Sequence, residues 1–278
     1  MNRRRTPRSA SAEELLTTLH HLTARARQEV ELHRARVELA QALQRGMLPA
    51  TLPALRGLQT AARYTPAHHG LDIGGDWYDG FALPDGSLGF AIGDVQGHDV
   101  EAAAFMGQIR IGMRAIAGTE PDPGEVMGRT NDLLVSVGST LFATCTFFRL
   151  DPLTWELHSA RAGHVPCVWA TADGRSGVTA DEGGMPLGIA AHERYPVTRH
   201  RLDAAGAFVL LTDGVVEGPS LQIDEGLDRV RQIVSAHAEA PAEELADEIL
   251  RAAELTGHED DAAVLVLRHE AAVRPKVT

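Results

Sequence analysis

Four short acidic turns constrain this chain more than any other feature of its sequence. They read GGDWYD, GDVQGH, TDG and EDD, and they contain Asp76, Asp94, Asp213 and the pair Asp260 and Asp261. A lone Asp-Gly is only a turn signal. Here, however, apolar strand-like runs adjoin three of these turns, in GFAIGD, FVLLTD and DDAAVLVL. If those strands are neighbours, the acids cluster at their ends, where like charges stay ionised only if cations neutralise them.

Between residues 53 and 270 the sequence consists of short apolar runs separated by Gly, Pro and Asp. Strands are predicted over 58–64, 86–95, 143–151, 155–163, 166–170, 207–213 and 262–269. Helices are predicted over 99–117, 123–137, 224–237 and 241–255. Turn signals such as Pro84-Asp85-Gly86 and Asp173-Gly174 join several of the strands as hairpins. This order favours antiparallel sheets covered by helices, within the α/β (α+β) class.

The N-terminal part has a different pattern. Residues 1–10 are basic and polar and are predicted to be a disordered tail, whereas residues 11–47 contain no Pro and no Gly before Gly46. An apolar stripe at spacings of three and four runs through this segment, from Leu15 to Ala40, and predicts one long helix. Two interpretations stay open: the helix lies on its own domain, or it projects and pairs with a second copy as a homodimer or regulatory linker.

Composition limits the kinds of partner and the cellular compartment that we expect for this protein. The formal net charge of −12 argues against nucleic acid as the main partner. No apolar run reaches the ~20 residues that span a bilayer, so we expect no membrane insertion and a cytoplasmic protein. The two cysteines, Cys145 and Cys167, lie in apolar segments and are expected to be reduced core residues.

The acidic turns also suggest a chemistry. Oxygen ligands without a His or Cys cluster select Mg²⁺ or Mn²⁺ over Zn²⁺. Two such ions a few ångströms apart can activate a water and clamp the oxygens of a phosphoryl group. Hydrolysis of a phosphate ester is therefore the leading hypothesis from the residues alone.

Six motifs in order resemble a known family. The series GGDWYD, GDVQGH, AGHVP, GMPLGI, LLTDGVVE and EDDAAVLVLR is similar to the PPM, or protein phosphatase 2C-like, metal-dependent phosphatases, and within them to the SpoIIE/RsbU-like bacterial branch. The resemblance implies two antiparallel β-sheets packed as a sandwich flanked by helices, here preceded by the long N-terminal helix. It also implies two Mn²⁺ or Mg²⁺ ions and serine/threonine phosphatase activity through a hydroxide that bridges them. The phosphatase domain would span 48–270, with a tail at 271–278.

The resemblance assigns roles to particular residues. Asp94 would bridge both ions and the Val95 carbonyl would join one of them, while Asp76 would serve the second ion. Asp213 and one of the C-terminal pair would hold the first ion, with Asp260 preferred over Asp261.

Other residues receive weaker assignments from the same resemblance. His98 is a candidate proton donor to the leaving oxygen, the alternative being a structural hydrogen bond in its loop. Asp79 is a hydrogen-bonding candidate and His164 a core or turn residue. Arg63 and Arg161 are the nearest candidates for a phosphate-binding arginine, against a simple salt-bridge role.

Substrate and activity are the last expectations. Branch members typically act on a phosphorylated Ser or Thr of a small anti-sigma-factor antagonist, which is the partner expected here. Asp99 stands where the branch usually has glycine, and it leaves open a catalytically inactive binding module. A phosphatase of a small phosphorylated metabolite is the third alternative.

Overall fold

The computed structural model describes residues 12–66, 74–97, 100–219, 221–254 and 260–271. Along the chain the elements are α1 (Ala12–Met47), β1 (Leu58–Thr65), β2 (Asp76–Ala82), β3 (Leu88–Val95), α2 (Val100–Ala117), α3 (Pro123–Val137), β4 (Ala143–Asp151), β5 (Glu156–Ala162), β6 (Val168–Thr171), β7 (Ser176–Val178), β8 (Val197–Arg201), β9 (Gly206–Leu211), the 3₁₀ turn η1 (Asp213–Val215), α4 (Ile223–Ala236), α5 (Ala242–Glu254) and β10 (Ala262–His269). The predicted disordered segment at 1–10 lies outside the described residues.

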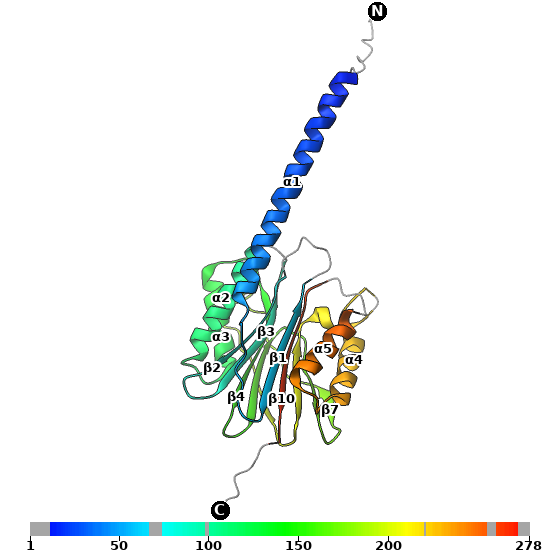
Figure 1. Ribbon diagram of the computed structural model, residues 1–278. Helices are drawn as coiled ribbons and strands as arrows, with labels where there is room; N and C mark the ends of the chain where they lie inside the picture. The colour runs from blue at the N-terminus through cyan, green and yellow to red at the C-terminus, as the bar shows by residue number, and fades with distance from the viewer. Residues whose placement is uncertain (1–11, 67–73, 98–99, 220, 255–259, 272–278) are drawn as a thin grey trace, which may run out of the picture.

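The strands form two five-stranded sheets in which every pairing is antiparallel. Their strand orders are β1-β10-β9-β6-β7 and β2-β3-β4-β5-β8. The sheets face each other, with α2 and α3 on the outside of one and α4 and α5 on the outside of the other (Figure 1). The expected sandwich flanked by helices is therefore confirmed.

Three apolar layers hold this arrangement together. Phe90, Phe148, Leu210 and Leu265 belong to the layer between the sheets, and all are fully buried. A second layer lies under α2 and α3 and a third under α4 and α5. The alternation of the strands explains this division, because successive side chains on one strand enter opposite layers.

Local chemistry sets several boundaries. Helix α3 begins after Asp122, whose Oδ1 accepts a hydrogen bond from the Glu125 amide at 3.0 Å, and Pro123 occupies its first turn. It ends at Gly138, which takes a left-handed φ of 74°. These signals explain why the predicted range 123–137 coincides with the observed helix.

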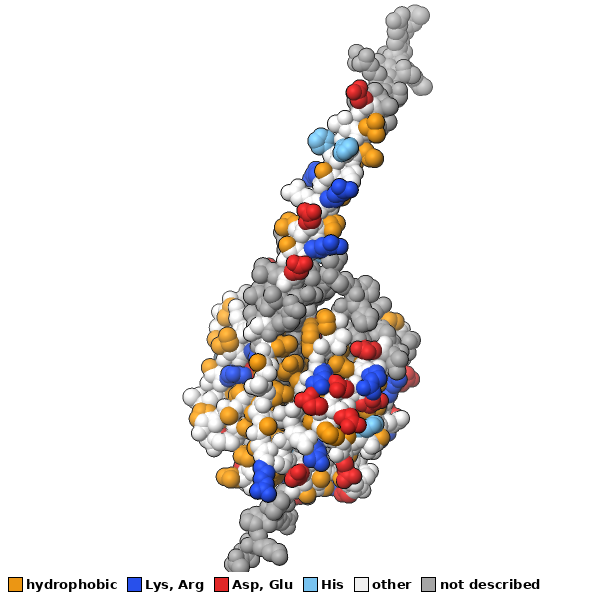
Figure 2. All heavy atoms as spheres, viewed as in Figure 1, with side chains coloured by type: hydrophobic (Ala, Val, Ile, Leu, Met, Phe, Trp, Pro, Cys, Tyr) orange, Lys and Arg blue, Asp and Glu red, His pale blue; other side chains and the backbone are white. Residues whose placement is uncertain are grey.

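Helix α1 projects away from the body, as Figure 1 shows. Figure 2 shows apolar side chains along it, interspersed with charged ones. Leu16, Leu19 and Leu22 are each at least 60% exposed, and Val30 and Leu32 more than half exposed. The interpretation in which this helix lies along its own domain therefore does not describe its outer part.

Candidate active site

The acidic residues predicted from the sequence come from both sheets. Asp76 begins β2 and Asp94 is the penultimate residue of β3, and the two are direct partners in the antiparallel register. On the other sheet, Asp213 follows β9, and Asp260 and Asp261 precede β10. Because Leu211 pairs with Val264, these two strand ends also meet.

The carboxyl groups raise one another's pKa values. Burial, then the charges of Asp213 and Asp260, raise the pKa of Asp94 to about 8. The pKa of Asp76 is raised well above its usual value, first by burial and then by the charges of Asp94 and Asp261. Burial and the charge of Asp260 raise that of Asp213. The five carboxyl groups therefore lie within electrostatic reach of one another, as the clustering hypothesis requires.

Hydrogen bonds fix the orientation of these side chains. The Thr212 hydroxyl donates to Asp76 Oδ2 at 2.6 Å, and Asp213 Oδ1 accepts from the Gly214 amide at 2.9 Å. Asp260 Oδ1 accepts from the Asp261 amide at 2.8 Å. The interaction of Thr212 joins residues 136 positions apart, and nothing in the sequence predicted it.

Two glycines bring the backbone against the cluster. A Cβ on Gly75 would stand 2.1 Å from the Val95 carbonyl oxygen and 2.8 Å from Asp94 Oδ1. A Cβ on Gly74 would stand 1.5 Å from Asp261 Oδ2. No side chain fits at either position, so this glycine pair lets the loop approach the acids and the Val95 carbonyl.

Two buried side chains, Trp77 and His164, lie beneath the acid cluster. Trp77 is fully buried and packs on Gly93, where a Cβ would come within 2.2 Å of its ring. His164 Nδ1 lies 2.8 Å from the hydroxyl of Thr144, the register partner of Asp94. Burial lowers the pKa of His164 to about 3. A neutral core histidine agrees with the expectation for AGHVP.

Asp79 points away from the cluster. Its carboxylate is 2% exposed and contacts two arginines of α2, Arg110 at 3.2 Å and Arg114 at 2.6 Å. The Arg114 guanidinium also lies over the Phe81 ring, 4.8 Å from its centroid. Asp79 therefore ties β2 to the helix that follows the Asp94 loop.

Both candidate phosphate-binding arginines are engaged elsewhere. Arg63 forms ion pairs at 2.6 Å with Glu243 and with Asp247 of α5. Arg161 donates to the backbone carbonyls of His164 and Asp181. These partners support the salt-bridge and structural alternatives for the two side chains. The other loop candidates, His98 and Asp99, lie outside the described residues.

The donor set suits a hard cation. All the convergent groups are carboxylates, with the Val95 carbonyl beside them, and such oxygen ligands are those that Mg²⁺ and Mn²⁺ prefer. Among the residues that the structure describes, no group of three or more Asp, Glu, His or Cys side chains is placed so that it could hold a metal ion as it stands. The fit rests instead on the all-oxygen chemistry and on the mutual repulsion that a cation would relieve.

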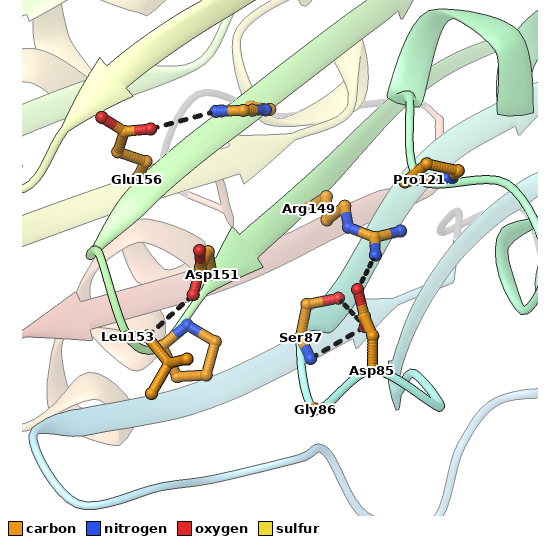
Figure 3. Close-up of a pocket in the computed structure, with 10 residues that line it drawn as sticks. Asp85, Gly86, Ser87, Pro121, Arg149, Asp151, Leu153 and Glu156 are labelled. Atoms are coloured by element: carbon orange, nitrogen blue, oxygen red, sulfur yellow. Dashed lines mark hydrogen bonds and ion pairs between the residues drawn. The ribbon is translucent and has the colours of Figure 1, made fainter.

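A polar cavity of about 440 Å³ lies at the turns that join β2 to β3 and β4 to β5, at the strand ends opposite Asp76 and Asp94 (Figure 3). Arg149 pairs with Asp85 there, while His158 Nε2 lies 3.6 Å from Glu156 Oε2, beyond hydrogen-bond distance. Asp85 also accepts hydrogen bonds from Ser87. Because Arg149 already pairs with Asp85, we assign no reactive role to this cavity.

Comparison with known proteins identifies the family. Residues 84–270 match the family model described as Stage II sporulation protein E (SpoIIE), and the chain belongs to this family. It therefore carries a PP2C-type serine/threonine phosphatase domain. The resemblance and the fold inferred from the motifs are confirmed.

Two individual relatives support the family assignment. The chain is 26% identical over 259 residues to "Phosphoserine phosphatase RsbU" of Bacillus subtilis, covering 90% of this chain and 74% of that protein. It is 28% identical over 265 residues to "Protein IcfG" of Synechocystis, covering 84% of this chain but only 40% of that protein.

Two solved structures have the same fold as this chain. The RsbU and RsbW domains of Rv1364c from Mycobacterium tuberculosis superpose with a TM-score of 0.73 at 30% identity, over 81% of this chain and 63% of that one. The SiaA-PP2C domain of Pseudomonas aeruginosa has the same fold, with a TM-score of 0.69 at 21% identity over 88% of this chain and 99% of that one. Among the described helices, none is long and apolar enough to cross a membrane.

Proposed function

We propose that this chain hydrolyses phosphoserine or phosphothreonine on a regulatory protein, and that its acid cluster holds two divalent cations, Mn²⁺ or Mg²⁺. One observation carries the proposal: carboxyl groups from two sheets converge and raise one another's pKa values. Such an arrangement destabilises the fold unless it serves a bound cation. The SpoIIE family membership supports the same conclusion.

The residues of the acid cluster would hold the two ions in the following way. Asp94, central to the cluster, would contact both ions, and the Val95 carbonyl would contact one. Asp213 and Asp260 would hold the first ion and Asp76 the second, with Asp261 orienting its neighbours. When bound, the ions would supply Lewis-acid activation of water and neutralise the phosphoryl oxygens.

His98 remains the proposed proton donor to the leaving seryl or threonyl oxygen. It follows the Asp94 loop directly in sequence, and an imidazole titrates near neutral pH. His164 is unsuited to this role, because it is 3% exposed and burial keeps it neutral.

The proposed substrate is a small folded anti-sigma-factor antagonist. RsbU is named a phosphoserine phosphatase, and a solved structure of the same fold, at 21% identity, is described as "The bacterial stressosome: a modular system that has been adapted to control secondary messenger signaling". The net charge of −12 gives no general attraction to an acidic phosphoprotein. Recognition would then depend on a local docking surface and on contacts beyond the phosphate.

The deciding experiment measures turnover. A chromogenic phosphate ester should be hydrolysed with Mn²⁺ or Mg²⁺ and not with EDTA. A folded phospho-antagonist should be dephosphorylated at least ~10-fold more efficiently in kcat/KM than an unstructured peptide with the same phosphosite, about 1.4 kcal/mol of transition-state stabilisation. No turnover of any ester would indicate an inactive binding module. Preference for a small phosphorylated metabolite would support the third alternative.

The exposed stripe of α1 is proposed to pair with a second copy of the chain. Leu19 and Leu22 are 64% and 60% exposed, and they lie three residues apart on one face. Replacing both with Glu should lower the mass measured by light scattering without ending ester turnover. Leu153→Glu is the matched control, because that leucine is 91% exposed in a turn of the body. A monomeric parent would refute the pairing.

A further inference from the structure

Thr212 connects the two sheets at the level of the acid cluster. It follows β9 directly, and its side chain is fully buried. Its hydroxyl donates to Asp76 Oδ2, at the start of β2 in the opposite sheet, at 2.6 Å. Within its own sheet, its amide donates to the Ala263 carbonyl at 3.1 Å.

The hydroxyl has little freedom to turn. The Ala263 amide donates to Thr212 Oγ1 at 2.9 Å, so the oxygen already accepts one hydrogen bond on the side of its own sheet. The single hydroxyl proton can then go to Asp76 Oδ2 at 2.6 Å or to the Ala263 carbonyl at 3.4 Å. The shorter contact is to a carboxylate, which is also the stronger acceptor.

The position of Asp76 makes this contact consequential. Asp76 is the register partner of Asp94, and the charge of Asp94 helps to raise the pKa of Asp76. Thr212 is also the residue before Asp213, which belongs to the cluster from the other sheet. One threonine therefore fixes an acid of one sheet while its own backbone carries the next acid of the other.

We propose that Thr212 is a positioning residue for cation binding: by holding Asp76 Oδ2, it aims the other oxygen of Asp76 at the space shared with Asp94 and Asp213. The inference rests on the proposed function of the cluster as a cation site. Oriented ligands of this kind typically lose about 10- to 100-fold in metal affinity when the supporting group is removed.

The test replaces the hydroxyl while keeping the shape. Thr212→Val is nearly isosteric and cannot donate, Thr212→Ser keeps the donor, and Thr212→Cys offers a weaker donor of similar size. Thr146→Val is the control, because Thr146 is equally buried in β4 and its hydroxyl has no hydrogen-bond partner among the described residues. Mn²⁺ binding is measured from the paramagnetic resonance of the free ion, and turnover is measured separately against Mn²⁺ concentration.

The expected result is a loss of Mn²⁺ affinity of at least ~10-fold in Thr212→Val, with a smaller change in kcat at saturating Mn²⁺. Thr212→Ser and Thr146→Val should stay within about threefold of the parent. If the valine variant does not fold, the cysteine variant carries the test, with an intermediate loss expected.

Two results would overturn the inference. One is Mn²⁺ affinity within twofold of the parent in whichever of the valine and cysteine variants folds. The other is a serine variant as impaired as the valine variant, which would mean that the methyl group matters and the donor does not. Because binding is measured apart from turnover, a parent that binds Mn²⁺ but hydrolyses nothing would refute the proposed function and leave this inference standing. A parent that binds no Mn²⁺ would overturn both.

Discussion

Cation binding should release protons, because the carboxyl groups at the site have raised pKa values. The pKa of Asp94 is raised to about 8, by burial and by the neighbouring carboxylates. At pH 7 a group with that pKa is about nine-tenths protonated, so binding an ion there should expel about 0.9 protons. Asp76, whose pKa is also raised, can only add to this number. From Asp94 alone we therefore expect Mg²⁺ affinity to increase about ninefold from pH 6 to pH 7 and about fivefold from pH 7 to pH 8, and to level off above that range.

The same shift predicts how the ion-free protein responds to pH. A carboxyl group whose folded pKa lies above its unfolded value contributes stability below the unfolded pKa and loses it as the pH rises through the folded one. For Asp94, with 3.8 unfolded and about 8 folded, the loss between pH 6 and pH 8 is about 2 kcal/mol. An excess of Mg²⁺ should abolish this loss, because it keeps the group ionised at both pH values.

Calorimetry provides the assay. Titrating Mg²⁺ at pH 7 in two buffers of different ionisation enthalpy gives the number of protons released, and urea unfolding at pH 6 and pH 8 gives the stability difference. Burial lowers the pKa of His164 to about 3 and that of His269 to about 4. Both histidines weaken the fold as the pH falls below about 6.5, but equally with and without Mg²⁺, so they cancel in the comparison. Release of fewer than about 0.3 protons, with affinity independent of pH, would refute the reasoning.

Four substitutions give three further tests. Asp94→Asn should abolish hydrolysis in a folded protein, and rates within about tenfold of the parent would remove Asp94 from the centre of the site. Asp260→Ala should impair turnover more than Asp261→Ala, and the reverse order would reassign the ligand. Asp79→Ala should destabilise the protein by about 3 kcal/mol in urea unfolding, because it leaves Arg110, whose side chain is 10% exposed, without its buried counter-charge. A loss below about 1 kcal/mol would contradict this last expectation.

Most strands and helices could be predicted because local signals and packing agreed. Strands β2, β7 and β8 are the exceptions, and the first residues of β2 fall within one of the acidic turns. Aspartate is depleted in strands, yet β2 begins with Asp76 and also contains Asp79, which is buried. Arg110 and Arg114 neutralise Asp79 from a helix more than 30 residues away, and no local pattern predicts such compensation. Strand β8, with its alternating arginines, was missed because edge strands that carry charge lack an apolar signature.

The candidate site was predictable to the extent that its acids adjoin apolar strands. The runs that end at Asp94 and Asp213 mark positions where a buried strand reaches the surface. Partners distant in sequence gave no such signal: Thr212 contacts Asp76 across 136 positions. The partners of Arg63 could not be predicted from its local sequence either. They are Glu243 and Asp247, which lie on α5, about 180 residues further along the chain.

The division of the acids between the sheets links folding to function. Asp76 and Asp94 belong to one sheet, and Asp213 and Asp260 to the end of the other. The apolar layer between the sheets, which contains Phe148 and Leu210, favours closing the sandwich, while repulsion between the carboxylates opposes it at one end. The fold therefore contains an electrostatic cost at the site that a cation would remove. A site of this kind forms only when both sheets are in place, and binding there in turn favours the closed sandwich.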